Sequence, residues 1–106
     1  MIIKYAADIR KSAIESSIRK IINQVYKLLP MREEGVDWIK PLETLIVELA
    51  GMDNLLIGQH ETLFRLLCKL EGLSILTQEE DFLLYRRTIF DCLSILDTLL
   101  KDVRAE

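Results

Sequence analysis

The stretch "FLLYRRTIFDCLSILDTLLKDV", residues 82–103, decides the fold because its apolar side chains recur at the spacing of one helix face. They follow one another alternately three and four residues apart, which lines up a single stripe along an α-helix. The positions of this stripe are Phe82, Tyr85, Ile89, Cys92, Leu96, Leu99 and Val103. A second apolar stripe beside it consists of Leu83, Phe90, Leu93 and Leu100. The sequence therefore predicts one long helix that is apolar over nearly half its circumference.

Shorter apolar patterns predict three further helices upstream of this one. The first has the same spacing at Ile14, Ile18, Ile21, Val25 and Leu28. We expect it to begin at about residue 4 and to stop before Pro30, because proline disfavours helical geometry in the residue that precedes it. Pro41 fits the first turn of a second helix. Gly51 and Gly72 are expected to end the second and third helices.

Two other stretches guide the expected chain path. The apolar run "LLI" at 55–57 lies between the second and third helices, and we expect the core to cover it. The run "TQEE" at 77–80 is a capping box, in which the first and last side chains satisfy free backbone N–H groups. It predicts that the fourth helix begins there.

The expected helix lengths predict an all-α, four-helix, bundle-like domain that spans residues 1–106. The first and last helices are expected to have about 25 residues and the middle two about 10 to 13. At a rise of 1.5 Å per residue, the outer pair is therefore about twice as long as the middle pair. Two short helices are too small to cover both stripes of the last helix, which predicts a homodimer. We expect its seam at Tyr85, Ile89, Leu93, Leu96 and Leu100. The alternative is a monomer whose short helices lie obliquely across the long pair.

The composition indicates a globular chain. Half of the 106 residues are apolar and 29% are charged, a balance that favours a folded core. The sequence contains no run of about 18 consecutive apolar residues, so we expect no transmembrane helix. The N-terminus places charges after its apolar pair, unlike a signal peptide, so we expect a cytoplasmic protein. Cys68 and Cys92 are both expected to be small core side chains in a reducing compartment.

Catalytic constellations are poorly represented. His60 is the only histidine, and "HETLF" lacks the second histidine of an H-E-x-x-H zinc helix. No Glu-x-x-Glu pair is present, and only Glu34 and Asp37 are acidic residues three apart. No glycine-rich phosphate loop occurs either. We therefore expect no catalytic, cofactor-binding or metal-binding residue and no enzyme, with a helical metal- or nucleotide-dependent enzyme as an alternative.

The charge is unevenly distributed along the chain. Net charge is −3, but residues 1–30 hold six basic and two acidic side chains, while the remainder holds eight basic and fifteen acidic ones. A protein that binds nucleic acid directly needs a dominant basic face, so we expect no such binding. An alternative function is a regulator or anti-defence protein whose acidic segment mimics nucleic acid.

The segment "PMREEGVDW", residues 30–38, is the least helical part of the chain. One interpretation is a turn at Gly35, with Asp37 capping the next helix and Trp38 packing against that helix's first turn. The other is a recognition surface, because an aromatic side chain ringed by charges is typical of interaction hot spots. Its contact residues would be Arg32, Glu33, Glu34, Asp37 and Trp38. Both interpretations stay open at this point.

The most plausible role is a non-enzymatic protein–protein interaction module. Small, acidic, helical chains without cofactors are common among bacterial and phage accessory or regulatory proteins, and we expect this protein to belong among them. Besides the second copy, the expected partner is an unidentified protein, with neither nucleic acid nor membrane bound directly.

Overall fold

The computed structural model describes residues 2–52 and 59–105, with side chains from residue 11 onward. In these ranges the chain forms four α-helices and no strand. They are α1 (Ile2–Glu33), α2 (Ile39–Gly51), α3 (His60–Leu73) and α4 (Phe82–Ala105), with a short 3-10 helix η1 (Glu79–Asp81) directly before α4. Their lengths are 32, 13, 14 and 24 residues. The predicted all-α, long–short–short–long order is confirmed.

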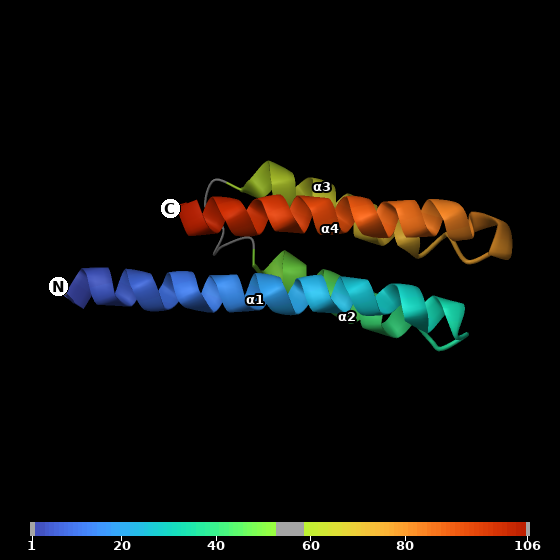
Figure 1. The fold of residues 1–106 in the computed structure, drawn as a ribbon, viewed down its shortest axis with the longest axis horizontal. Coiled ribbons are helices and arrows are strands. Elements are labelled where there is room, and N and C mark those ends of the chain that lie inside the picture. The colour runs from blue at the N-terminus through green and yellow to red at the C-terminus, as the bar shows by residue number, and fades with distance from the viewer. Residues whose placement is uncertain (1, 53–58, 106) are drawn as a thin grey trace.

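The helices run alternately up and down the long axis of a molecule that measures 55 × 23 × 19 Å. The two long helices, α1 and α4, lie side by side and antiparallel, and the short helices α2 and α3 pack behind them (Figure 1). Each helix contacts its two neighbours around the bundle. Because the order alternates, the α1–α2 and α3–α4 connections meet at the same end.

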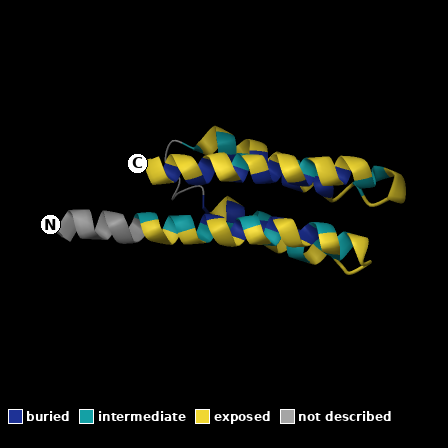
Figure 2. Cartoon of the chain, viewed as in Figure 1, coloured by how far each residue is buried: buried dark blue, intermediate teal, exposed yellow. Residues whose placement is uncertain are grey.

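A continuous apolar core runs between the helices. Buried positions form stripes along the long helices, with exposed positions outside (Figure 2). The least exposed side chains of α1, α2 and α3 are Ile18, Ile21, Val25, Leu28, Leu42, Leu45, Leu49, Leu63, Leu66, Leu70 and Leu73. Among the described residues no polar or charged residue is fully buried. Burial of apolar surface is therefore the main force that holds the helices together.

The α4 stripe is covered within a single chain. Tyr85, Ile89 and Leu96 are 0% exposed, while Leu93 and Leu100 are 8% and 7% exposed. The core covers these positions because α4 packs against both α1 and α3, whereas Leu83 and Phe90 of the second stripe stay exposed. These five positions therefore do not need a second chain to leave water, and the homodimer stays a prediction.

The prediction that Pro30 ends the first helix is wrong, because α1 continues to Glu33. Pro30 is exposed, so the carbonyl that its missing N–H leaves unbonded stays near water. The helix ends instead at Gly35, whose φ of +74° is in the left-handed region. Gly35 N–H donates to the Arg32 carbonyl and Val36 N–H donates to the Met31 carbonyl, at 3.2 and 2.9 Å. This pair of bonds is the Schellman ending of a helix.

Several smaller expectations also need correction. Gly51 is the last residue of α2, and α3 continues one residue beyond Gly72. Cys92 is buried as predicted, whereas Cys68 is exposed. Cys68 lies two positions from both Leu66 and Leu70, and 200° of helical rotation places it opposite that buried stripe. The "LLI" run at 55–57 lies outside the described residues.

Candidate functional site

The two connections at one end of the bundle form the candidate site. We call this surface the turn end and define it as residues 32–38 and 76–82. It contains all five residues that the sequence selected as a partner contact, and it adds the segment before α4. The helices position this surface, because the connection from α1 to α2 and the connection from α3 to α4 lie at the same end of the bundle (Figure 1).

Arg32 holds the two connections together. It lies four residues after Leu28, so the continuation of α1 through Pro30 places it in line with the buried stripe of that helix. Its guanidinium donates one hydrogen bond to the Leu76 carbonyl and a second, of 2.6 Å, to the Gln78 carbonyl. Bonds from a charged donor are stronger than neutral ones. Arg32 therefore links the end of α1 to the segment that precedes α4.

Three aromatic rings surround the same guanidinium. The Arg32 Cζ lies 4.4 Å from the ring centre of Tyr85, 5.6 Å from that of Trp38 and 5.7 Å from that of Phe82. A guanidinium at these distances is attracted by the ring faces. The Trp38 and Tyr85 rings pack edge to face, with centres 4.9 Å apart and planes at 70°. The Arg32 side chain is thus occupied by contacts within the chain.

Tyr85 anchors this cluster to the core. Its hydroxyl donates a hydrogen bond of 3.3 Å to the Leu28 carbonyl, and its side chain is fully buried. Burial raises the pKa of Tyr85 to about 12, and the nearby Arg32 charge opposes this rise only in part. The hydroxyl therefore keeps its proton at neutral pH and remains a donor.

The α1–α2 turn differs in detail from the expected one. Asp37 Oδ1 accepts a hydrogen bond of 3.1 Å from the N–H of Ile39, the first residue of α2, but the N-cap residue is Trp38, which makes no side-chain cap. Trp38 was expected to pack against the first turn of its own helix. Its half-buried ring packs edge to face on Tyr85 of α4 and against the apolar core.

The capping box before α4 lies one residue later than predicted. Asp81 Oδ2 accepts a hydrogen bond of 3.3 Å from the Gln78 N–H, where Thr77 and Glu80 were expected. Gln78 has extended geometry, with φ −85° and ψ 155°, and the chain makes the 3-10 turn η1 before α4. The shift leaves the Glu79 and Glu80 side chains exposed.

The turn end has an open surface hollow of about 590 Å³. It is lined by Arg32, Glu33, Trp38, Thr77, Glu79 and Phe82. The sequence pattern did not predict that Thr77, Glu79 and Phe82 lie beside residues 30–38. The alternating direction of four helices does predict it, because it places the first and third connections at the same end of the bundle.

The charge of the turn end is strongly negative. Its acidic residues are Glu33, Glu34, Asp37, Glu79, Glu80 and Asp81, and its one basic residue is Arg32, which gives a net charge of −5. In the described part of the chain, the ion pairs join Lys69 to Asp91, Lys101 to Asp97 and Arg104 to Glu15. All three lie away from the turn end, so its carboxylates are not neutralised by them.

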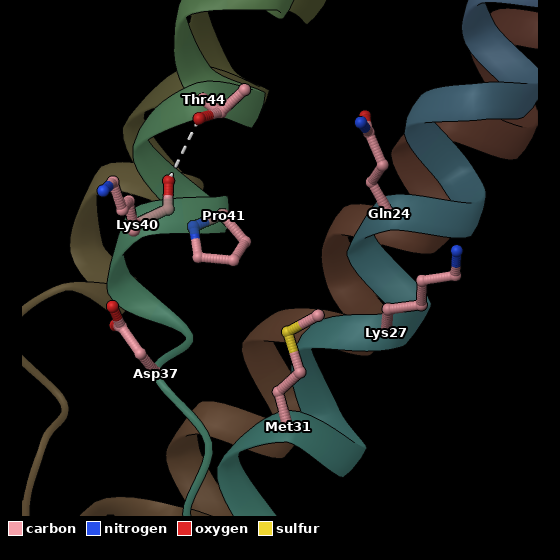
Figure 3. A pocket seen from close by; sticks show the side chains of 7 residues that line it. All are labelled: Gln24, Lys27, Met31, Asp37, Lys40, Pro41 and Thr44. Atoms are coloured by element: carbon pink, nitrogen blue, oxygen red, sulfur yellow. Dashed lines mark hydrogen bonds between the residues drawn. The ribbon is translucent and has the colours of Figure 1, made fainter.

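A second hollow, of about 570 Å³, lies between α1 and α2. Figure 3 shows its lining residues, Gln24, Lys27 and Met31 of α1 together with Asp37, Lys40, Pro41 and Thr44. The ammonium ends of Lys27 and Lys40 point away from each other (Figure 3). Gln24 Oε1 is buried without a hydrogen-bond partner there. The polar groups of this hollow do not converge on one point, so we assign it no chemistry.

The reactive side chains are dispersed. His60 is exposed at the first residue of α3, about 20 Å along that helix from the turn end. Burial raises the pKa of the Cys92 thiol to about 12, so this thiol is not a nucleophile at neutral pH. Within residues 2–52 and 59–105, no group of three or more His, Cys, Asp or Glu side chains is arranged to hold a metal ion.

Comparisons with known proteins add no relative. No family model, curated protein or solved structure matches this chain.

Proposed function

We propose that this chain is a non-enzymatic protein-interaction module and that its partner binds at the turn end. The observation that carries the proposal is the hollow lined by Trp38, Phe82, Glu33 and Glu79. There, half-buried aromatic rings lie beside exposed carboxylates. Aromatic anchors with a polar rim are typical of protein interfaces.

The internal contacts that link the two connections support this proposal. Arg32 binds two carbonyls of the opposite connection, and the Tyr85 hydroxyl binds the end of α1. A surface that is already fixed loses little conformational entropy when a partner binds. The internal contacts of Arg32 therefore act in favour of binding, and Arg32, which also lines the hollow, stays among the proposed contact residues.

Two further parts of the proposal concern chemistry and location. We propose no enzymatic activity, because His60 lies at the far end of α3 from the hollow. Among the described residues, no helix has the length and apolar character needed to cross a bilayer. We propose a cytoplasmic location, supported by the free thiols of Cys68 and Cys92, since disulfides are rare in reducing compartments.

The homodimer is proposed on a different face from the predicted seam. Tyr26 of α1 and the α4 residues Leu83 and Phe90 are 55%, 76% and 45% exposed. These side chains gain from burial in an interface between two copies. Sedimentation at tens of micromolar chain tests this arrangement, and a monomer at that concentration contradicts it.

The acidic turn end also favours a second candidate function, a regulator that mimics nucleic acid. Its six carboxylates could occupy a basic groove of a DNA-binding partner. Competition decides between the two: duplex DNA displaces the captured partner if the chain is a mimic, and leaves it bound if the chain is a plain interaction module.

Affinity capture from the native host tests the proposed function. We expect one protein to be retained by the wild type and lost with Glu34→Arg, an exposed charge reversal in the turn end. Asp102→Arg is the matched control, because Asp102 is also exposed but lies near the other end of α4. Equal retention by all three chains would overturn the location, and no specific partner would overturn the function.

A further inference from the structure

We propose that the turn-end hollow accepts a cationic side chain, arginine or lysine, from a basic segment of the partner protein. This inference rests on the proposed function and adds the chemical class of the partner. It follows from the charge around the hollow, from its aromatic walls and from the contacts that already occupy Arg32.

The charge around the hollow selects a cation. Glu33 and Glu79 line it from the two connections, and both are exposed. In the part of the chain that the structure describes, neither forms an ion pair, and the whole turn end carries −5. Like charges that line one hollow repel each other, and an incoming cation relieves this repulsion. An anionic or purely apolar guest would leave it in place.

The walls of the hollow suit a guanidinium or an alkylammonium group. Trp38 and Phe82 both line it and are half-buried, so part of each ring remains accessible. Aromatic rings attract cations, and the apolar stem of an arginine or lysine packs well on them. The chain already shows this chemistry, since the Arg32 guanidinium lies 5.6 and 5.7 Å from the centres of the same rings.

Arg32 does not satisfy the carboxylates of the hollow. Its hydrogen bonds go to the carbonyls of Leu76 and Gln78, and in the described part of the chain it forms no ion pair with Glu33 or Glu79. Its charge opposes a second cation, but six acidic side chains outweigh one basic side chain in this surface. The favoured guest is therefore a cation, and a basic segment would supply further charges to the outer carboxylates.

A second copy of this chain is the competing occupant. Residues 1–30 carry six basic and two acidic side chains, so the first helix of another copy offers positive charge as well. However, a contact between the turn end of one copy and the α1 surface of another closes into a dimer only if it is reciprocal, and otherwise leaves the same surfaces free for the next copy. We therefore take a different protein as the occupant, and self-association through the hollow is an outcome of the test.

Fluorescence of Trp38 tests the inference directly, because it is the only tryptophan of the chain and lines the hollow. The probe is an acetylated, amidated nonapeptide of alternating arginine and glycine. Its control peptide carries citrulline, which is neutral and similar in shape, in place of each arginine. We expect saturable, salt-sensitive binding of the arginine peptide and no saturable change with the citrulline peptide.

A matched pair of variants locates the binding. Glu33→Gln/Glu79→Gln should weaken the arginine peptide at least about fivefold, the loss expected for two exposed ion pairs. Glu61→Gln/Asp102→Asn removes the same charge from exposed positions outside the turn end, and should leave affinity within about twofold. Far-UV circular dichroism confirms that all variants are folded, since every substituted side chain is exposed.

Four results would overturn the inference. They are no saturable binding, equal binding of the citrulline peptide, equal weakening by both variant pairs, and self-association that Glu33→Gln/Glu79→Gln abolishes. The last result assigns the hollow to a second copy. If the captured partner still needs Glu34 while the arginine peptide does not bind, the proposed function stands and only the cationic class of the partner is wrong.

Discussion

The sequence predicted two interaction surfaces, the α4 stripe and the turn end, and the two differ in how far the fold buries their side chains. The five α4 positions are at most 8% exposed within one chain. At the turn end, Arg32 is bound within the chain, whereas the carboxylates of Glu33, Glu34, Glu79 and Glu80 are exposed. The five α4 positions thus serve packing within the chain, whereas the turn end keeps the exposed charges on which the proposed function depends.

The largest expected effect is a loss of stability when the buried α4 stripe is disrupted. Leu96→Asp places a carboxylate at a position that is 0% exposed, and we expect it to lower the free energy of unfolding by more than about 5 kcal/mol. The chain should then be unfolded by circular dichroism at 25 °C. Ser94→Asp, at an exposed position of the same helix, should change stability by less than about 0.5 kcal/mol. A folded Leu96→Asp monomer would contradict this packing of α4.

The next effect concerns Arg32, which belongs to both the fold and the turn end. Arg32→Ala removes two hydrogen bonds and the contacts with three rings, so we expect a loss of about 3 kcal/mol in urea unfolding. Arg32→Lys keeps the charge without the fork of donors and should recover about half. Arg87→Ala, at an exposed position, is the control. Equal stability of Arg32→Ala and Arg87→Ala would show that Arg32 does not link the connections.

Stability at high pH tests the burial of Tyr85. Its pKa is raised from 10.0 to about 12, so its contribution is complete below pH 10 and is lost as the pH rises toward 12. A rise of this size corresponds to about 3 kcal/mol. Tyr85→Phe should lose about 1 kcal/mol at pH 7 with the hydrogen bond to Leu28, and then lose less than the wild type between pH 10 and 12.

Cys92 provides the background for this measurement, because its pKa is also raised, from 9.0 to about 12. Both chains share this thiol, so the wild type and Tyr85→Phe should weaken alike between pH 9 and 10. Urea midpoints at pH 8, 9, 10, 11 and 12 check the prediction. An identical decline in the two chains above pH 10 would mean that the Tyr85 hydroxyl is not buried.

The smallest effect compares two glycines. Gly35 has a φ of +74°, which an alanine adopts with strain, so Gly35→Ala should lower stability by about 1 kcal/mol. Gly72 lies inside α3, and an added Cβ would meet no atom within 4 Å. Gly72→Ala should therefore raise stability by about 0.5 to 1 kcal/mol. Thermal unfolding distinguishes the two, and a shift in the same direction for both would contradict the helix ending at Gly35.

The helices could be predicted from local sequence, because the spacing of apolar residues within one helix is enough to identify its buried face. The stripe from Ile18 to Leu28 and the stripe from Tyr85 to Val103 are both buried as their spacing indicates. The end of α1 could not be predicted in the same way. Pro30 and Gly35 are both residues at which a helix can end. Which of them ends α1 depends on whether Pro30 is exposed, because a helix tolerates a proline better where the unbonded carbonyl stays near water.

The candidate site was only partly predictable for a related reason. The stretch of residues 30–38 drew attention to Arg32, Glu33 and Trp38, but their partners Phe82 and Glu79 lie more than forty residues away in the sequence. Only the antiparallel topology brings them together. Likewise, the expected dimer rested on the length of the short helices, whereas coverage of α4 depends on which flank each neighbour occupies.

The most direct test of the central claim compares cross-linking from these two regions. A photoreactive benzoylphenylalanine replaces Val36 at the turn end in one chain and Phe90 on the exposed face of α4 in another. We expect the captured partner to form a covalent product from position 36 and not from position 90. A product from position 90 alone would contradict the claim that the turn end is the binding surface.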